Sequence, residues 1–296
     1  MLPAQPAIRQ PAGIRGPQMR KGMTTSLRER GGARPAVQTV ARAAMVQARE
    51  AALLLSVAAT APVRLFRGDS ESADSMSPQR KAHAAPLRPV LLVHGFGGAK
   101  SSWSLVAQAL SAQGLTVDAM SYAPVGHSVE QLAENLVVEV ERTLSRTGAD
   151  KVHLVGHSLG GVIIAQAILD TRLNDRVDTV ITLGSPFGGS PWAGLLPFVE
   201  MVRALRHGSP LLRRLARTPL PDGVRWVSVT AGLDVVVPGL RSVPPHAQVE
   251  TITVNGVGHL GMLLSRRVIG CIAAALSADE SATAAEPSMG LLPTAS

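Results

Sequence analysis

Gly156-His157-Ser158-Leu159-Gly160 is the stretch that decides the fold, because an apolar run lies on each side of it. Residues 152–155 have the length and composition of a buried strand, and residues 161–169 have those of a helix. A serine in a tight turn between a strand and a helix is the pattern of a nucleophile elbow. Because a serine hydroxyl is a poor nucleophile without a base beside it, a catalytic Ser158 requires partner residues elsewhere in the chain.

Strand-like and helix-like segments alternate on both sides of this turn. The expected strands are residues 89–93, 115–120, 152–155, 177–183, 224–230 and 249–254. The expected helices are residues 101–112, which start at a serine cap, 129–144, 161–169 and 262–276. This alternation predicts an α/β fold, with a mostly parallel, doubly wound sheet flanked by helices. We expect one catalytic domain over residues 88–276, since a chain of this length can bury one large core.

The positive charge of the chain lies almost entirely in its first third. The whole chain has a net charge of +8, whereas residues 91–296 alone have a net charge of −1. A basic arm can bind anionic lipid or nucleic acid, but arginines spread among Pro, Gly, Gln and Ala are typical of a solvated, disordered segment. No nucleic-acid-binding motif accompanies the arm. We therefore expect residues 1–87 to be a basic, largely disordered extension that binds no nucleic acid.

Within this extension, residues 36–65 have a helical pattern with a nearly uncharged core at 51–63. About thirteen apolar residues are too few for a membrane span, which needs roughly twenty. They fit the apolar core of a signal peptide that starts at Met45 and is cleaved at 59–61, which predicts export or membrane association. The alternative is an amphipathic helix that packs on the body or makes a peripheral membrane contact. Without a signal or anchor, a cytoplasmic location is expected.

Composition also marks the segments that flank the catalytic domain. Residues 68–87 are rich in Ser, Asp, Pro and Lys and are predicted to be a linker. Residues 277–296 are of low complexity, so we expect a disordered tail. Cys271 is the only cysteine of the sequence, which rules out a disulfide within the chain. In an apolar helix it is expected to pack as a small hydrophobic residue.

One connection, residues 186–223, is far longer than the usual two to six residues. Its apolar residues are Trp192, Leu195, Leu196, Phe198, Val199, Met201, Val202 and Leu205. Its arginines, at positions 203, 206, 213, 214 and 217, come mostly after them. We expect a helical, amphipathic insertion where ligands bind in open parallel sheets, which predicts a lid. The alternative is a helix pair that packs permanently on the body.

Asp234 and His259 are the expected partners of Ser158. A serine hydrolase needs a base beside the nucleophile and an acid that orients the base. In this architecture they follow in the order serine, acid, histidine. Asp234 comes shortly after the strand at 224–230, and His259 follows the strand at 249–254 in a glycine-rich loop. Both are therefore expected at the carboxyl ends of strands, where the elbow also lies.

The other acids and histidines are less suitably placed. Asp222 precedes its strand and Glu250 begins one, so both are expected at the opposite end of the sheet. His246 comes before the last strand, and His207 lies in the insertion. His157 flanks the nucleophile but projects from the turn, so we expect a structural role for it.

The oxyanion of a tetrahedral intermediate needs two hydrogen-bond donors, which backbone N–H groups can provide. The first expected donor is Leu159, immediately after the nucleophile. The second is Phe96, in the loop at 94–98 that follows the first strand of the domain. Glycines on both sides of Phe96 allow the backbone to turn its N–H inward. These two N–H groups are the predicted oxyanion hole.

Four motifs in this order carry a resemblance to a known family. They are residues 91–98, the elbow, residues 182–190 and residues 256–263. Over residues 88–276 the chain resembles the α/β-hydrolase superfamily, and within it bacterial triacylglycerol lipases and lipase-like esterases. It departs from them at Ser185-Pro186-Phe187, where the family often has Thr-Pro-His. Near His259 it also lacks a carboxylate pair recognisable as the calcium site of some lipases, so calcium dependence is not implied.

The expected function is hydrolysis of carboxylic esters, either acyl lipids or similarly apolar esters, through an acyl-enzyme. Ser158, Asp234 and His259 would be catalytic, and the chemistry requires no metal or organic cofactor. An acyltransferase would use the same residues with an alcohol in place of water, and the sequence does not separate the two. A non-catalytic protein of this fold that binds a lipid or a partner is disfavoured, because no position of the catalytic set is missing.

Overall fold

The computed structural model of the chain describes residues 41–53, 56, 88–194 and 199–284. The predicted linker at 68–87 and the predicted cleavage site at 59–61 lie outside these residues, as does most of the apolar core at 51–63. Residues 41–53 and 56 are helical. Within the described ranges, no helix is both long enough and apolar enough to cross a bilayer.

The predicted parallel sheet is confirmed, and six strands form it within the part of the chain that the structure describes. They are β1 (Val90–Val93), β2 (Val117–Met120), β3 (Val152–His157), β4 (Val177–Leu183), β5 (Arg225–Ala231) and β6 (Val249–Val254). Their order is β2-β1-β3-β4-β5-β6, and all neighbours are parallel. β1 and β3 are buried along their whole length, as continuous apolar runs require.

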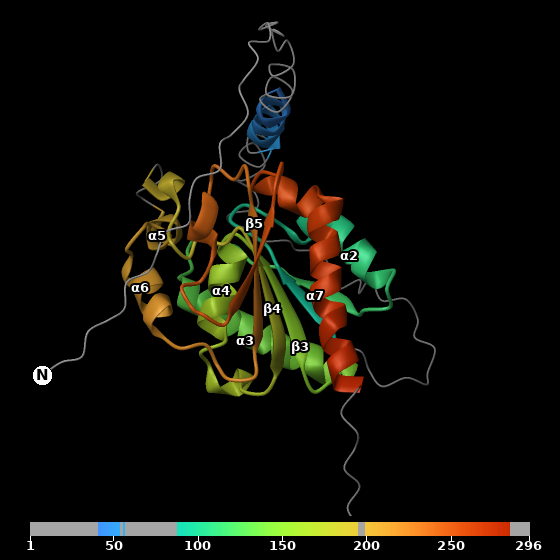
Figure 1. The fold of residues 1–296 in the computed structure, drawn as a ribbon. Helices are drawn as coiled ribbons and strands as arrows, with labels where there is room; N and C mark the ends of the chain where they lie inside the picture. The colour runs from blue at the N-terminus through green and yellow to red at the C-terminus, as the bar shows by residue number, and fades with distance from the viewer. Residues whose placement is uncertain (1–40, 54–55, 57–87, 195–198, 285–296) are drawn as a thin grey trace, which may run out of the picture. The chain divides into compact units, whose positions relative to one another are not determined.

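Helices cover both faces of the sheet (Figure 1). They are α2 (Ser104–Ser111), α3 (Val129–Thr147), α4 (Leu159–Ala167), α5 (Glu200–Ala204), α6 (Pro210–Arg217) and α7 (Arg266–Ala284). Short 3-10 helices are η1 (Lys100–Trp103), η2 (Thr171–Leu173), η3 (Pro191–Gly194), η4 (Gly239–Ser242) and η5 (Leu260–Leu264). α2 and α7 lie on one face, and α3 and α4 on the other.

Each strand supplies side chains to two separate cores. In β1, Leu91 and Val93 pack with α3 and α4, whereas Val90 and Leu92 pack with α2 and α7. All four side chains are fully buried. Successive side chains of a strand point to opposite faces of a sheet, so an unbroken apolar run is what a sheet with helices on both faces needs.

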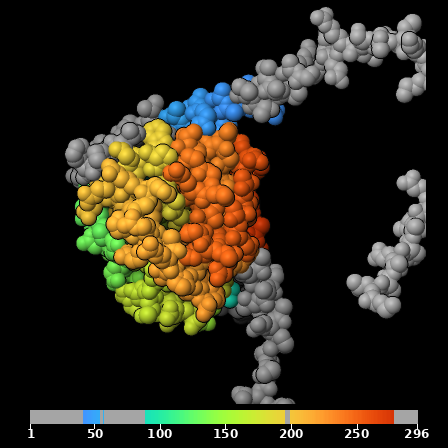
Figure 2. Space-filling view, turned by 60° about the vertical axis from the view of Figure 1, so that its left-hand side comes forward, coloured from blue at the N-terminus to red at the C-terminus, as the bar shows by residue number. Residues whose placement is uncertain are grey.

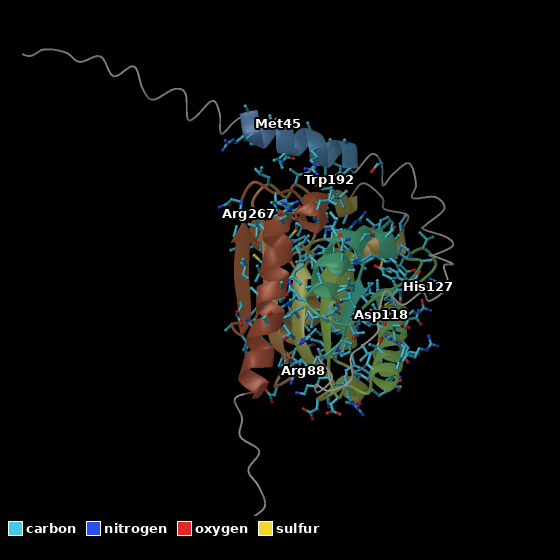
Figure 3. The ribbon with its side chains drawn as sticks, turned by 90° about the vertical axis from the view of Figure 1, so that its right-hand side faces the viewer. Met45, Arg88, Asp118, His127, Trp192 and Arg267 are labelled. Carbon is cyan, nitrogen blue, oxygen red and sulfur yellow. The ribbon has the colours of Figure 1, made fainter. Side chains whose placement is uncertain are left out.

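The strand order places β1 and β3 where the winding of the sheet reverses, because β1 lies between β2 and β3. Ligands of open parallel sheets bind beyond the carboxyl ends of the strands at such a point. Ser158 directly follows β3, and the loop with Phe96 follows β1. In Figure 3, Arg88, which precedes β1, lies near one end of the sheet and Trp192, in η3, near the other.

The first helix of the domain starts later than predicted. The 3-10 turn η1 precedes α2, and the N-cap residue of α2 is Trp103, which makes no side-chain cap hydrogen bond. The prediction of a serine cap at Ser101 is therefore wrong. Trp103 is 1% exposed and packs in the core beneath α2. Burial of a large aromatic side chain determines this start, and the capping preference of serine does not.

The second helix, α3, begins where predicted, with an N-cap whose hydrogen bonds are reciprocal. The hydroxyl of Ser128 accepts from the N–H of Gln131, and the side chain of Gln131 accepts from the N–H of Ser128. The helix continues past its predicted end at Leu144 and stops before Gly148, which has a φ of 68°. A left-handed glycine is a common helix terminator because it carries no Cβ atom.

The end of the domain differs from its prediction in two ways. The expected helix at 262–276 is divided into η5 and α7, which begins at Arg266. α7 then continues to Ala284, so the predicted start of a disordered tail at Ser277 is corrected. The extra residues contain several alanines, which have the highest helix propensity. Low sequence complexity indicated disorder here, whereas helix propensity and a packed preceding segment favour continuation of the helix.

The long connection at 186–223 is helical, as predicted, and comprises η3, α5 and α6. Its buried apolar side chains Met201, Val202, Leu205, Leu211, Leu212 and Leu215 belong to the core on the α3 and α4 face. Leu195, Leu196 and Phe198 lie outside the described residues. The described part of the insertion therefore packs on the body, as the alternative to a lid predicted. Movement of the insertion as a lid stays a prediction.

Candidate active site

Ser158 occupies the turn between β3 and α4 with a strained backbone. Its φ of 53° and ψ of −120° lie in a region that residues with a side chain rarely adopt. Among the described residues, only Ser158 and Asp175 combine a side chain with a positive φ. Such strain costs about 1–3 kcal/mol and persists where the surrounding structure imposes it. The N–H of Ser158 donates to the carbonyl of Leu183 at 2.9 Å, which ties the turn to the end of β4.

The two glycines of the motif allow other backbone segments to approach the turn closely. A Cβ atom on Gly160 would lie 2.1 Å from the carbonyl oxygen of Val93. A Cβ atom on Gly156 would lie 2.6 Å from the backbone nitrogen of Gly161. Both contacts involve backbone atoms that cannot rotate away. The start of α4 is therefore packed directly on the end of β1, from which the loop with Phe96 begins.

Asp234 and His259 form a buried hydrogen-bonded pair. The Nδ1 atom of His259 lies 2.8 Å from Oδ2 of Asp234, and the two residues are 4% and 6% exposed, respectively. The second oxygen, Oδ1, accepts from the N–H groups of Val236 and Val237 at 2.8 Å and 2.7 Å. The carboxylate is thus held on both sides. A Cβ atom on Gly184, at the end of β4, would lie 3.0 Å from Oδ2, so this backbone lies against the pair.

This hydrogen bond determines which ring nitrogen of His259 carries a hydrogen. A carboxylate only accepts, so Nδ1 is the donor, and Nε2 of the neutral ring keeps its lone pair. That tautomer is the one a general base requires. On its backbone side, the carbonyl of His259 lies 3.1 Å from Nε2 of His157, which must donate for the same reason. Both the ring and the main chain of His259 are therefore held.

The structure brings the predicted site residues to the carboxyl ends of four strands. Ser158 follows β3, Asp234 follows β5, His259 follows β6, and Phe96 follows β1. The rings of His157 and His259 are 4.7 Å apart between centroids, so the elbow contacts the loop of the predicted base. Leu159 begins α4, and N–H groups in the first turn of a helix have no acceptor within it.

The loop of Phe96 lies against the elbow. A Cβ atom on Gly95 would be 3.0 Å from Cβ of Ser158. Phe96 itself is half-buried and packs against the core under α3 and α4. The two N–H groups predicted to bind an oxyanion thus come from two segments in contact, and their role stays a proposal.

The competing residues lie away from this pair. Asp222 is exposed in the turn before β5. Glu250 lies in β6 and forms an ion pair with Arg225, with an N–O distance of 2.7 Å. His207 is exposed in the insertion, and its Nδ1 lies 2.8 Å from the carbonyl of Gly188. None of these three carboxyl or imidazole groups has the buried pairing of Asp234 and His259.

Tyr122 supports the loop of Phe96, a role that was not predicted from the sequence. Its ring stacks on His94 at 4.0 Å between centroids and 2° between planes. Its hydroxyl donates to the carbonyl of His94, and burial raises the pKa of Tyr122 well above 10, so the hydroxyl keeps its hydrogen. Tyr122 follows β2, the neighbour of β1. Adjacent carboxyl ends of parallel strands are the signal that could have indicated the contact.

His157 is a buried histidine that stays neutral. Burial, followed by the nearby charge of His259, lowers the pKa of His157 to about 3. In the unfolded chain its pKa is about 6.5. Between these two values the unfolded state binds a proton that the folded state does not. The free energy of unfolding therefore falls as the pH falls, by about 1.4 kcal/mol per pH unit below pH ~6.5 from this residue.

We expect the substitution His157→Gln to flatten this acid dependence. Between pH 7 and pH 5 the wild type should lose about 2 kcal/mol of stability through His157, in addition to what other groups contribute. Urea unfolding of both proteins at the two pH values measures the difference. His127→Gln is the matched control, because His127 is exposed and should leave the slope unchanged. Equal slopes for wild type and His157→Gln would contradict the buried, neutral state.

The insertion is tied to the loop that carries Asp234. The hydroxyl of Ser190 donates to the carbonyl of Val236 at 2.6 Å, and the indole N–H of Trp192 donates to Val235 at 2.8 Å. Figure 2 shows the insertion, yellow to light orange, as a surface layer beside the orange segments that follow it. An open cavity of about 490 Å³ lies between residues 124–128 and residues 199–201 at its edge.

A family model places this arrangement among known proteins. The model for the alpha/beta hydrolase fold matches residues 88–230. That range contains the elbow and the loop of Phe96 and ends before Asp234 and His259. The Asp234–His259 pair therefore rests on the geometry described above.

Curated relatives match shorter parts of the chain. A dihydrolipoyllysine-residue acetyltransferase component of the acetoin cleaving system of Cupriavidus necator is 37% identical over 33% of this chain and 26% of its own length. The sn-1-specific diacylglycerol lipase ABHD11 of Danio rerio is 25% identical over 55% and 54%. A triacylglycerol lipase of Vibrio cholerae is 34% identical over 36% and 35%. The chain thus spans between about a quarter and about half the length of these relatives.

A solved structure extends the likeness of fold across the catalytic domain. Lipase BlEst2 of Bacillus licheniformis, in its mature form, matches with a TM-score of 0.59 and 17% identity, over 67% of this chain and 96% of that one. At this identity the match concerns the fold alone. Together with the family model, the parallel sheet and the elbow, these likenesses show that the chain has the α/β-hydrolase fold and resembles lipases and lipase-like esterases.

Proposed function

We propose that the chain is a serine-dependent carboxylic ester hydrolase that acts on acyl lipids or similarly apolar esters through an acyl-enzyme. The observation that carries this proposal is the buried 2.8 Å hydrogen bond between Asp234 and His259, at the same end of the sheet as the strained turn of Ser158. Acyl transfer needs a carboxylate, an imidazole that the carboxylate orients, and a serine hydroxyl that is presented on a tight turn. Lipase-named relatives support the choice of ester substrates.

In the proposed reaction the hydroxyl oxygen of Ser158 attacks the ester carbonyl while Nε2 of His259 takes its proton. Asp234 holds the ring and stabilises the imidazolium that forms. The N–H groups of Phe96 and Leu159 donate to the negative carbonyl oxygen. Collapse of the intermediate breaks the ester bond, and His259 protonates the leaving alcohol. Water then attacks the acyl-enzyme by the same steps, which releases the acid and restores Ser158.

The apolar insertion supports an apolar substrate. Most of its described apolar side chains are buried on the body. Trp192 is 47% exposed and donates a hydrogen bond to the carbonyl of Val235, next to Asp234. An apolar acyl chain that leaves water on binding gains roughly 0.8 kcal/mol per buried methylene. We therefore propose that the insertion borders the acyl-binding region, and that long chains are bound more tightly than short ones.

An acyltransferase is the second candidate, because two relatives have acetyltransferase names. One is the acetyltransferase component of Cupriavidus necator, and the other is a probable alcohol acetyltransferase of Wickerhamomyces anomalus, 30% identical over 28% of this chain. An alcohol would then replace water in the second step, with the same catalytic residues. Product analysis with an added alcohol separates the two, since predominance of the new ester over free acid would favour the transferase.

A chain-length series of p-nitrophenyl and glycerol esters tests the proposed function. We expect hydrolysis with saturation kinetics, and covalent labelling of Ser158 by an alkyl phosphonate, which mass spectrometry of the peptide would locate. A rate that jumps when the glycerol ester exceeds its solubility would indicate a lipase whose insertion moves as a lid. Saturation below that limit would indicate an esterase. Absence of hydrolysis and of labelling at Ser158 would overturn the proposal.

A further inference from the structure

One carboxylate outside the catalytic set reaches the loop of His259. Glu50, on the helix formed by residues 41–53, is 2% exposed. Its two oxygens accept hydrogen bonds from the N–H groups of Leu260 at 2.9 Å and Gly261 at 2.6 Å. These N–H groups begin η5 and directly follow His259. In the first turn of a helix such N–H groups have no acceptor within the helix, and a carboxylate is the strongest acceptor that can satisfy them.

The same helix also contacts the loop of Asp234. The side-chain nitrogen of Gln47 donates to the carbonyl of Leu233 at 2.9 Å. Residues three apart lie on one face of a helix, so Gln47 and Glu50 act from the same side. One bond is made to the residue before Asp234, and the others to the residues after His259. The 41–53 helix therefore joins the two loops whose side chains form the buried pair.

Glycines in the loop of His259 leave room for the Glu50 side chain. A Cβ atom on Gly258 would lie 2.2 Å from Cγ of Glu50, and one on Gly261 would lie 2.7 Å from Oε1. The glycines on both sides of His259 thus leave the space that Glu50 occupies. Met45, on the same helix, is 67% exposed (Figure 3). Apolar burial of the helix therefore does not account for its contact with the body. Gln47 and Glu50 make this contact through hydrogen bonds.

A buried carboxylate is a costly way to attach a helix. Removing an ionised group from water is unfavourable unless hydrogen bonds replace its hydration. An apolar side chain would attach the helix without that cost, but it could not hold two N–H groups. The carboxylate fixes the peptide units that follow His259, while Asp234 fixes the ring and His157 fixes the carbonyl. A displacement of about 1 Å in a catalytic group can cost on the order of 10² in rate.

We infer that Glu50 is a positioning residue for His259, and that the 41–53 helix is required for full catalytic activity. This inference rests on the proposed ester hydrolase function. It also favours a packed amphipathic helix over a leader that is removed at 59–61, since cleavage there would separate Glu50 from the domain. Residues 41–53 would then stay with the enzyme that turns over substrate.

The test compares Glu50→Gln with the wild type in the full-length chain. The glutamine side chain has nearly the same size, but only one of its two terminal atoms is an acceptor. Its NH₂ group would face the N–H of Leu260 or Gly261, which cannot accept a hydrogen bond. We expect kcat for a p-nitrophenyl ester to fall about 10- to 100-fold with KM changed less than about twofold. Hydrogen exchange of the amides of Leu260 and Gly261, measured by mass spectrometry, should become faster. Glu141→Gln is the matched control, because Glu141 is exposed on α3 and should change neither quantity.

The outcomes separate this inference from the function on which it rests. Faster exchange with an unchanged kcat would show that Glu50 only attaches the helix, and would overturn the inference alone. Unchanged exchange at Leu260 and Gly261 would overturn the contact itself. A wild type that hydrolyses no ester would overturn the proposed function and this inference together. If Glu50→Gln does not fold, Gln47→Leu removes the bond to Leu233 and keeps the carboxylate. A kcat for that variant equal to that of the wild type would then contradict the inference that the 41–53 helix is required for full activity.

Discussion

Replacement of Ser158 by alanine is expected to abolish ester hydrolysis while the protein stays folded. Removal of the nucleophile of such a catalytic set typically costs on the order of 10⁴ to 10⁶ in rate, because no other group can form the acyl-enzyme. The fold is expected to survive because the turn is held through the backbone, where the N–H of Ser158 donates to the carbonyl of Leu183. The side chain of Ser158 makes no cap hydrogen bond to α4. Initial rates with p-nitrophenyl butyrate and the thermal midpoint measure the two halves of this prediction.

Ser104→Ala is the matched control for that variant, because Ser104 is exposed at the start of α2. It makes the same chemical change far from the elbow along the chain, and wild-type activity is expected. Loss of labelling by an alkyl phosphonate should accompany the loss of hydrolysis only in Ser158→Ala. Wild-type hydrolysis by a folded Ser158→Ala protein would show that another residue is the nucleophile, and would remove the basis of the proposed function.

Asp234→Asn is expected to lower kcat by roughly 10⁴, with little change in KM. The structure determines how the amide would lie. Its oxygen must stay where Oδ1 is, because the N–H groups of Val236 and Val237 point there. The amide nitrogen then faces Nδ1 of His259 and donates to it, so the ring hydrogen moves to Nε2. In that tautomer His259 has no lone pair with which to accept the proton of Ser158.

Asp222→Asn is the control for Asp234→Asn, because Asp222 is exposed in the turn before β5 and is expected to leave kcat unchanged. Steady-state kinetics at pH 8 and circular dichroism of both variants are the measurements. A fall in kcat of less than about tenfold in Asp234→Asn would mean that the tautomer of His259 is set by another group, and the proposed role of Asp234 would be wrong. A similar loss in both variants would indicate a general effect of the lost charge.

The central strands could be predicted from the sequence because β1, β3, β4 and β5 are buried along nearly their whole length. Residues 177–183 and 249–254 were predicted with the bounds that β4 and β6 have. A continuous apolar run between turn residues leaves few alternatives to a central parallel strand. Helix ends were predicted less well. The start of α2 depends on the burial of Trp103, which is a tertiary contact that no local pattern reveals.

The members of the candidate site were found through the strands that precede them. Asp234 and His259 follow β5 and β6, and carboxyl ends of parallel strands meet at one edge of a sheet, so their proximity could be expected. Their hydrogen bond, and the support given by Tyr122 and Glu50, could not. Glu50 lies 210 residues from Leu260 along the chain. A single acidic residue at the start of an apolar run forms no sequence motif, so its hydrogen-bond partner could not be predicted.

The sequence alone therefore determined the fold class and the identities of the residues proposed to react, because periodicity, turn chemistry and order along the chain are local properties. The tertiary structure alone decided how those residues are held: the tautomer of His259, the orientation of Asp234 and the contact of Glu50 with the residues that follow His259. Each of these depends on hydrogen-bond directions between segments that are distant in sequence. Such directions are set when the cores pack and the loops meet, and no stretch of the chain contains them beforehand.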